Sequence, residues 1–282
     1  MHIEKWENYM LPVLDSRTVE TFKLPYLKKT IKIKPYKGAQ EKRLLNCLTN
    51  KKDRKKWLVN LLEIIKENVV DCDIDLSKLK IVDFLFITYK LRSISKSDRF
   101  DYQVKCSGII KNEDGTTKKC SHIFKDSISM DNLLKVKNID VVQKIVDVNE
   151  NLSLELVPPD LRYLSYMADL GEKEFEQVQN SDRITDPEKE EIKNIFELFA
   201  SKIAFSVSKV IINEDGKKNV YTEFTEDEVV NNILMNLTVD EIQKILKELG
   251  NLISLSIGIK KVCPECGKVY EEEDGSFFQF LT

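Results

Sequence analysis

Hydrophobic residues recur at helical spacing in the first third of the chain. This spacing predicts helices over residues 40–48 and 54–67. One apolar stripe of the second helix consists of Trp57, Leu58, Leu61, Leu62 and Ile65. Residues 81–91 are apolar almost throughout, which is typical of a largely buried helix. These helices are expected to build a core rather than to bind a cofactor.

Elsewhere polar and apolar residues alternate with the period of a strand. Residues 28–34 alternate in this way and stop at Pro35, so we predict an edge strand there. Turn signals at 112–115 and 213–216, and the sequence around residue 265, predict hairpins. The paired segments are 100–106 with 120–124, 204–212 with 220–224, and 255–260 with 268–270.

Start signals for helices gather in the second half of the chain. Asp160 can cap a helix over 161–170, and Asp186-Pro187 can open one over 188–201. Two sequences have the spacing of a capping box, Thr225 to Glu228 and Thr238 to Glu241. A strand over 152–157 stops at Pro158-Pro159, where we place a boundary.

Together these elements predict an α+β fold that is rich in helix and contains short β-hairpins. We expect an N-terminal arm over 1–22, an α+β module with a cysteine-bearing hairpin over 23–157, and a helical module over 158–282. The last module ends in a second cysteine-bearing hairpin.

Cys263 and Cys266 occupy a C-x-x-C-G sequence, a loop in which two thiolates and backbone amides can surround a tetrahedral metal ion. A structural zinc site needs four ligands. Cys106 and Cys120 are the other place with several soft ligands, and their hairpin brings both thiols to one end. We therefore predict that the two hairpins clasp one structural zinc ion, with His122 as a neighbour rather than a ligand.

Other roles for these cysteines remain open. Cys106 and Cys120 can be buried thiols that pack as small hydrophobic residues. Cys263 and Cys266 can be a redox pair, although the βαβ context of a thioredoxin-like motif is not predicted here. Cys47 and Cys72 have no metal-ligand spacing and are expected to pack in the interior.

Composition narrows the class of protein. The chain has 282 residues, of which 42% are hydrophobic, so it can bury a substantial core. We expect no membrane span and no secretion signal at the N-terminus, and hence a reducing compartment. Six cysteines in so long a chain then favour a metal site over a disulfide framework.

Charge is distributed unevenly along the chain. Residues 23–56 contain thirteen Lys and Arg against two acids, whereas residues 169–197 contain ten acids against four bases. The basic residues alternate with Ile31 and Ile33, so we interpret them as a solvated face rather than a nucleic-acid surface.

The run from Lys80 to Ser95, KIVDFLFITYKLRSIS, continues through a strand into Cys106 and resembles the central motif of the T-even-type phage baseplate protein family. Leu24-Pro25, residues 31–35 and residues 41–45 resemble the opening of that family. Residues 53–57 with Ile64-Ile65 resemble its next helix. The resemblance covers residues 20–125, the C-terminal cysteine turn and Phe277-Phe278.

The resemblance implies a non-enzymatic part of a contractile phage tail, associated with the baseplate hub as a component or as an assembly factor. It implies partners among other baseplate or tail proteins, a location in the virion tail baseplate and assembly in the host cytoplasm. The family motif falls on Asp83, Leu91, Arg92 and Ser95, which are expected at fold or partner-contact positions. One departure is that thirteen residues separate Cys106 from Cys120, where the family leads us to expect a C-x-x-C.

Two other functions compete with this one. The cysteine turn and the basic segment also fit a zinc-ribbon nucleic-acid-binding or transcription-associated factor, whose affinity would fall steeply with salt. A redox protein that uses Cys263 and Cys266 is the third candidate. No glycine-rich phosphate loop or H-E-x-x-H motif is present, and the chain has two histidines, so the sequence predicts no enzyme.

Overall fold

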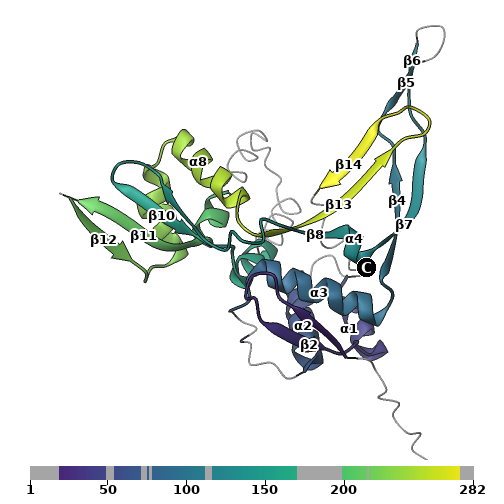
Figure 1. Ribbon diagram of the computed structural model, residues 1–282, viewed down its shortest axis with the longest axis horizontal. Coiled ribbons are helices and arrows are strands. Elements are labelled where there is room, and N and C mark those ends of the chain that lie inside the picture. The colour runs from purple at the N-terminus through teal and green to yellow at the C-terminus, as the bar shows by residue number, and fades with distance from the viewer. Residues whose placement is uncertain are drawn as a thin grey trace, which may run out of the picture.

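The computed structural model describes residues 19–48, 54–70, 75, 78–111, 116–169, 199–214 and 216–273. These residues form a mixed α+β structure, as the sequence predicts, and all the strand pairs among them are antiparallel. Figure 1 shows three parts: an N-terminal lobe around α1, α2 and α3, a sheet lobe around β10, β11 and α8, and a cysteine head formed by two long hairpins.

The N-terminal lobe packs three helices against a small sheet. Its strands are β1 (Glu20–Lys23), β2 (Thr30–Ile33) and β3 (Val69–Val70), in the order β1-β2-β3. Its helices are α1 (Gly38–Leu48), α2 (Arg54–Asn68) and α3 (Ile81–Ser95). The helices agree with the predicted ranges. The prediction that 28–34 forms an edge strand is wrong, because β1 and β3 pair with β2 on both sides.

The core of this lobe follows the apolar pattern of the sequence. Ile31 and Ile33 are buried while Lys32 between them is exposed. Most of the predicted α2 stripe is buried and packs with α3. The N-terminus of α3 has no side-chain cap, but the Ile81 amide donates a hydrogen bond to the Pro159 carbonyl at 2.9 Å. One of the unpaired amides at the start of the helix is thereby satisfied from a distant part of the chain.

The sheet lobe contains four strands, β9 (Lys144–Asp147), β10 (Leu152–Leu156), β11 (Val207–Glu214) and β12 (Lys217–Tyr221). Their order is β12-β11-β10-β9. The predicted helix over 161–170 is present, with residues 161–169 helical, and Asp160 accepts a hydrogen bond from the Arg162 amide. Residues 199–204 are also helical and include the end of the helix predicted over 188–201. Residues 188–198 of that predicted helix lie outside the described residues.

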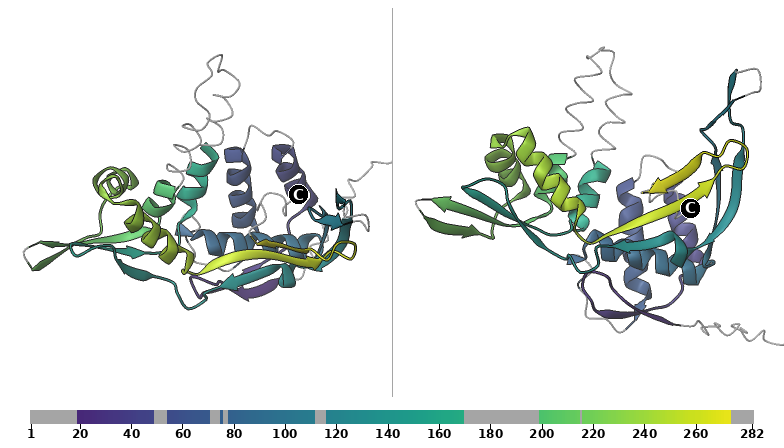
Figure 2. Two further views of the ribbon diagram at one scale, coloured as in Figure 1. Left: turned by 90° about the horizontal axis from the view of Figure 1, so that it is seen from above. Right: turned by 45° about the horizontal axis from the view of Figure 1, so that its top comes forward.

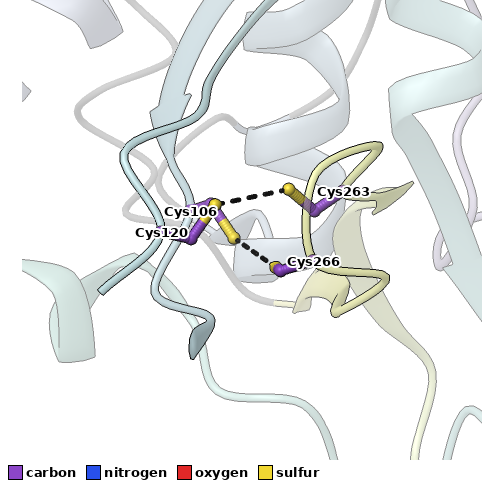
Figure 3. Close-up of side chains that lie close together, drawn as sticks. All are labelled: Cys106, Cys120, Cys263 and Cys266. Atoms are coloured by element: carbon purple, nitrogen blue, oxygen red, sulfur yellow. Dashed lines mark hydrogen bonds between the residues drawn. The ribbon is translucent and has the colours of Figure 1, made fainter. Parts of the chain in front are cut away.

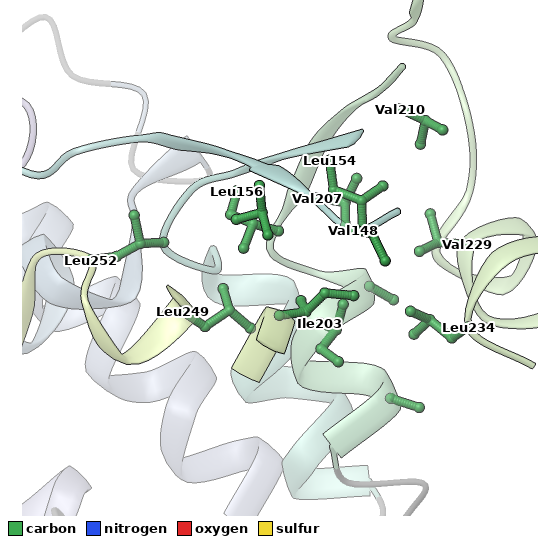
Figure 4. Packing of buried hydrophobic residues seen from close by; sticks show 14 residues of the cluster. Val148, Leu154, Leu156, Ile203, Val207, Val210, Val229, Leu234, Leu249 and Leu252 are labelled. Atoms are coloured by element: carbon green, nitrogen blue, oxygen red, sulfur yellow. The ribbon is translucent and has the colours of Figure 1, made fainter. Parts of the chain in front are cut away.

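The rest of the sheet lobe is helical and covers one face of the sheet. It consists of α7 (Glu226–Glu228), the π-helical turn η2 (Val229–Ile233), the 3-10 turn η3 (Leu234–Asn236) and α8 (Val239–Gly250). Both predicted capping boxes are confirmed at Thr225 and Thr238. Figure 4 shows how residues from the strands and these helices meet in one apolar core, with Leu154, Ile203 and Leu249 among them.

The cysteine head consists of two hairpins that lie side by side in both Figure 1 and Figure 2. The first pairs β4 (Arg99–Lys105) with β7 (Ile123–Ser129) and continues as β5 (Ile109–Lys111) with β6 (Thr117–Lys119). The second pairs β13 (Ser254–Val262) with β14 (Val269–Glu273). The helix α4 (Met130–Leu133) and β8 (Leu134–Lys137) connect the head to the lobes, because β8 pairs with the first half of β13.

Pro158 and Pro159 lie between the N-terminal lobe and the sheet lobe. Strands from both sides of the two prolines form the four-stranded sheet, since β9 and β10 precede them and β11 and β12 follow. Lys80 also forms an isolated bridge with Asp160. The division of the chain into modules at the two prolines stays a prediction.

Candidate metal centre

The first hairpin places two cysteines on the same face. Lys105 pairs with Ile123 in β4–β7, and Ile109 pairs with Lys119 in β5–β6. Between these ladders Cys106 donates a backbone hydrogen bond to His122 at 2.9 Å, and Cys120 donates one to Gly108 at 2.8 Å. The register is therefore continuous through the interruption. Because side chains alternate between the faces of a strand, the even-numbered Cys106 and Cys120 share one face.

The second hairpin carries its two cysteines in the turn. The Cys263 amide donates to the Lys268 carbonyl, and the Gly267 amide donates to the Cys263 carbonyl, both at 2.9 Å. Gly267 has a φ of +69°, a left-handed conformation that favours glycine. This tight turn directs both thiols toward the first hairpin, as Figure 3 shows.

The four sulfur atoms form a compact group. The Sγ atoms of Cys106 and Cys266 are 3.6 Å apart, those of Cys120 and Cys263 are 3.7 Å apart, and all four lie within 4.8 Å of one another. Zinc–sulfur bonds of about 2.3 Å in a tetrahedron place the sulfurs about 3.8 Å apart. Three of the cysteines are buried and Cys266 is half-buried. This arrangement could hold a metal ion such as zinc.

The distances exclude disulfides in this structure, since a disulfide joins its sulfur atoms at about 2.05 Å. All four cysteines are free. The packing alternative for Cys106 and Cys120 explains their burial but not why the other two thiols approach them across the hairpins.

Backbone amides surround the sulfurs and change their acidity. The Gly108 amide donates to the Cys106 Sγ at 3.3 Å. Burial raises the pKa of Cys263, but hydrogen bonds from the Cys266 and Glu265 amides and from neighbouring thiols outweigh it, and the pKa falls to about 7. A hydrogen bond from the His122 backbone lowers the pKa of Cys120, whereas burial and the other thiols raise it more, to about 12.

The thiols also restrict one another's ionisation. Four thiols in one small volume cannot all ionise, because each thiolate repels the next. The pKa of Cys263 is lowered, whereas the pKa values of Cys120 and Cys266 are raised. A divalent cation at the centre would reverse this preference by neutralising the thiolates, so metal binding would release protons.

Gly108 is a functional residue that the sequence analysis missed. A Cβ at this position would lie 2.4 Å from the Cys266 Sγ and 3.2 Å from the Cys106 Sγ. Any side chain there would occupy the place of the sulfur. The signal in the sequence is a glycine two residues after a candidate ligand, but its importance depends on the approach of the second hairpin.

His122 and Glu265 lie beside the four cysteines. The His122 Nδ1 is 3.4 Å from a Glu265 carboxylate oxygen, and the histidine ring packs edge-on against Phe124 at 4.9 Å. The other Glu265 oxygen is 3.7 Å from the Cys120 Sγ. His122 is thus a neighbour that links the hairpins, and Glu265 is a second residue that the sequence analysis did not single out.

The four positions of the family motif lie on α3, away from the cysteines. Asp83 is fully buried, and its carboxylate accepts the amides of Tyr26 at 2.7 Å and Leu27 at 2.9 Å. Leu91 is buried in the core of the N-terminal lobe. The Ser95 hydroxyl accepts the Tyr36 amide at 3.0 Å and donates to the Leu91 carbonyl.

These contacts serve the fold. Asp83 and Ser95 attach the segments before and after β2 to α3, since Tyr26 and Tyr36 flank that strand. Burial raises the pKa of Asp83 more than its two amide hydrogen bonds lower it. Arg92 is half-buried near Tyr36, where its charge lowers the raised pKa of that phenol. A role of Arg92 or Ser95 in contact with a partner stays a prediction.

A surface hollow of about 500 Å³ lies elsewhere, between the sheet and the π-helical turn. Its lining combines the asparagines Asn149, Asn151, Asn232 and Asn236 with Glu150 and apolar side chains. Within the described ranges the lining contains no pair of a nucleophile and a base. We therefore assign no catalytic role to it.

Comparison with known proteins identifies one related family. A family model described as T4 bacteriophage base plate protein matches residues 16–279, which include both lobes and the head. No curated protein and no solved structure matches the chain significantly. Among the described residues, the helices are too short or too polar to cross a membrane.

Proposed function

Because the chain belongs to the T4 bacteriophage base plate protein family, we propose that it is a non-enzymatic structural or assembly protein of the hub region of a contractile phage tail baseplate. Its partners are other baseplate or tail proteins, and it acts in the virion tail baseplate after assembly in the host cytoplasm. The observation that carries the proposal is the family match over residues 16–279.

We further propose that Cys106, Cys120, Cys263 and Cys266 bind a structural zinc ion. The donor set supports this, because four thiolates leave no open coordination position for water or substrate. The site is also closed, with three buried sulfurs and Phe124 beside them. When bound, the ion would hold the turn of the second hairpin against the first.

A redox role for Cys263 and Cys266 has less support. The lowered pKa of Cys263 fits a reactive thiol, but a redox thiol must also be reached by its partner. Cys263 is 1% exposed and Cys120 faces it at 3.7 Å. The geometry therefore favours four ligands for one ion over a pair that exchanges electrons.

Elemental analysis of the purified, reduced protein tests the metal proposal. We expect about one zinc per chain. That zinc should be lost in both Cys106→Ser and Cys263→Ser, since the two cysteines of either hairpin alone bind zinc weakly. Zinc that is lost from Cys263→Ser alone would refute a site shared by the hairpins. Metal-replete protein without zinc would refute the zinc site itself.

Reconstitution tests the baseplate proposal. The full chain is expressed with the tail proteins of the same phage, and complexes are separated by size at low and at high salt. We expect a stoichiometric complex with a hub or tail protein. Binding to DNA or RNA that falls steeply with salt, without a tail complex, would instead support the nucleic-acid-binding alternative.

A further inference from the structure

The first hairpin of the cysteine head has two faces with different surroundings. In its continuous register the even-numbered Cys106 and Cys120 share one face, and the odd-numbered positions form the other. On that second face the Ser107 hydroxyl accepts a hydrogen bond from the Lys268 ammonium group of the second hairpin at 3.1 Å. We call the odd-numbered positions from Lys105 to Lys125 the outer face. Each described side chain on the outer face is exposed: Lys105, Ser107, Ile109, Thr117, Lys119, Ser121, Ile123 and Lys125.

Two polar side chains of the inner face contact the second hairpin. Asp126 forms an ion pair with Lys261 of the second hairpin, and His122 contacts Glu265. Among the described side chains of the outer face are three lysines, Lys105, Lys119 and Lys125, and no acid. Within the described part of the chain, no ion pair involves these three lysines.

Two isoleucines lie among these lysines. Ile109 is 62% exposed and Ile123 is 43% exposed. A β-branched hydrophobic residue gains from packing on a strand surface, and nothing in the described chain covers these two. The outer face therefore combines exposed apolar groups with a rim of positive charge.

We propose that the outer face is the docking surface for an acidic partner protein of the tail, whose apolar side chains cover Ile109 and Ile123 and whose carboxylates pair with the surrounding lysines. This inference rests on the proposed function, which requires a protein partner. The sign of the charge defines the chemistry of that partner, because complementary potentials favour the encounter and like charges oppose it.

The charges and the side-chain types of the outer face argue against two other occupants. Two copies of this chain meeting through their outer faces would bring lysine rims together. Single-stranded nucleic acid is held by aromatic side chains on which bases stack, and the described outer face offers isoleucine instead. An acidic protein surface is the occupant that fits both the exposed isoleucines and the lysines around them.

The metal centre and the docking surface lie on opposite faces of one ribbon. A two-stranded hairpin is marginally stable in water by itself. Its inner face is fixed to the second hairpin at the cysteines, so the outer face presents its side chains from an ordered strand pair. The four cysteines would thus keep the outer face ordered without contacting the partner.

Site-specific photo-crosslinking tests the proposal. The full chain carries p-benzoylphenylalanine in place of Ile109 and is expressed together with the tail proteins of the same phage. The control carries the same probe in place of Val220 of β12, which is 56% exposed. We expect irradiation to link position 109 to an acidic surface of one tail protein, with a yield about tenfold above that at position 220.

Charge reversal provides the second readout. Lys105→Glu combined with Lys125→Glu should lower the crosslink from position 109 about tenfold, whereas Lys217→Glu combined with Lys218→Glu on β12 should leave it unchanged. Zinc content and melting temperature are measured for each variant. If the protein with Lys105→Glu and Lys125→Glu loses its zinc, the single substitution Lys119→Glu is used instead of that pair.

The outcomes separate this inference from the proposed function. A tail complex that forms without crosslinks at position 109, or that is insensitive to Lys105, Lys119 and Lys125, would overturn the docking surface and leave the baseplate role intact. Crosslinks from position 109 to nucleic acid would overturn it as well. Absence of any tail complex would overturn both.

Discussion

The cysteine head and the sheet lobe are both built from antiparallel strands, but their interiors differ. Among the described residues, fourteen buried hydrophobic residues form the core of the sheet lobe. The buried cluster of the head consists of Cys106, Cys120, Phe124 and Cys263. Burial of apolar area can stabilise the lobe, whereas the buried cluster among the described side chains of the head has one phenylalanine and otherwise consists of cysteines. The two regions should therefore respond to different perturbations.

Chelation of the metal should produce the largest difference between the responses of the head and the sheet lobe. Structural zinc contributes on the order of 10 kcal/mol of apparent binding free energy in small zinc domains, so we expect its removal to open the head. Amide hydrogen exchange in residues 105–125 and 262–269 should accelerate by more than about a hundredfold, while that in β10 and β11 stays constant. Equal acceleration in both regions would show that the comparison is wrong.

Leu154→Ala is the converse perturbation. Leu154 is fully buried in the sheet lobe, and its truncation should lower the free energy of unfolding by about 2–5 kcal/mol. Chemical denaturation measures this change, and elemental analysis should find the zinc content unaltered. Val220→Ala on the exposed side of β12 serves as the control, with an expected change within about 0.5 kcal/mol.

Gly108→Ala tests the geometry of the head without removing a ligand. The new methyl group would lie 2.4 Å from the Cys266 Sγ, and a sulfur bound to metal cannot rotate away from it. We expect metal affinity to fall at least about tenfold in competition with a chromogenic chelator. Gly250→Ala is the matched control, since a Cβ there has no neighbour within 4 Å. Unchanged affinity in Gly108→Ala would contradict the four-cysteine site.

The smallest expected effect concerns a charge in the sheet lobe. Burial raises the pKa of Glu155, but the Ser208 hydroxyl and the Lys209 ammonium group, 3.0 Å away, lower it more. The folded pKa is therefore below the unfolded one. Glu155 contributes stability above the ordinary carboxyl pKa, and this contribution is lost as the pH falls through the lower folded value.

Lys209→Met should accordingly reduce the free energy of unfolding near neutral pH by about 1 kcal/mol, because Lys209 is partly exposed and solvent screens the pair. The difference from the parent should shrink at an acidic pH below the ordinary carboxyl pKa, as the Glu155 carboxyl group becomes protonated. Denaturation curves at the two pH values measure it. A difference of equal size at both would rule out a contribution from the Glu155 charge.

The sequence predicts the fold best where the hydrophobic period is long. The helices α1, α2 and α3 are confirmed within a few residues, because their apolar stripes span several turns. The prediction that β2 lies at the edge of its sheet was wrong. Its neighbours β1 and β3 have four and two residues, and strands this short show little periodicity in the sequence. The π-helical turn after Thr225 was also missed, because a capping box marks where a helix begins and not how it continues.

Part of the candidate site could be predicted from local patterns. The C-x-x-C-G turn and the hairpin around residue 114 each give two cysteines at one end of a strand pair, and the structure brings all four together. Gly108 and Glu265 could not be predicted in the same way. Their contacts are with the other hairpin, and their significance follows from the approach of segments about 150 residues apart in the chain.

The unbroken register of the first hairpin has a consequence for how this chain can change during evolution. Residues added at the tip, beyond Lys111 and Thr117, lengthen the hairpin without moving Cys106 or Cys120. A single insertion between Cys106 and Ile109 would instead turn the following residues over and exchange the two faces. The number of residues between these cysteines is thus free to drift, and homologous chains should conserve Gly108 and the alternation rather than the spacing.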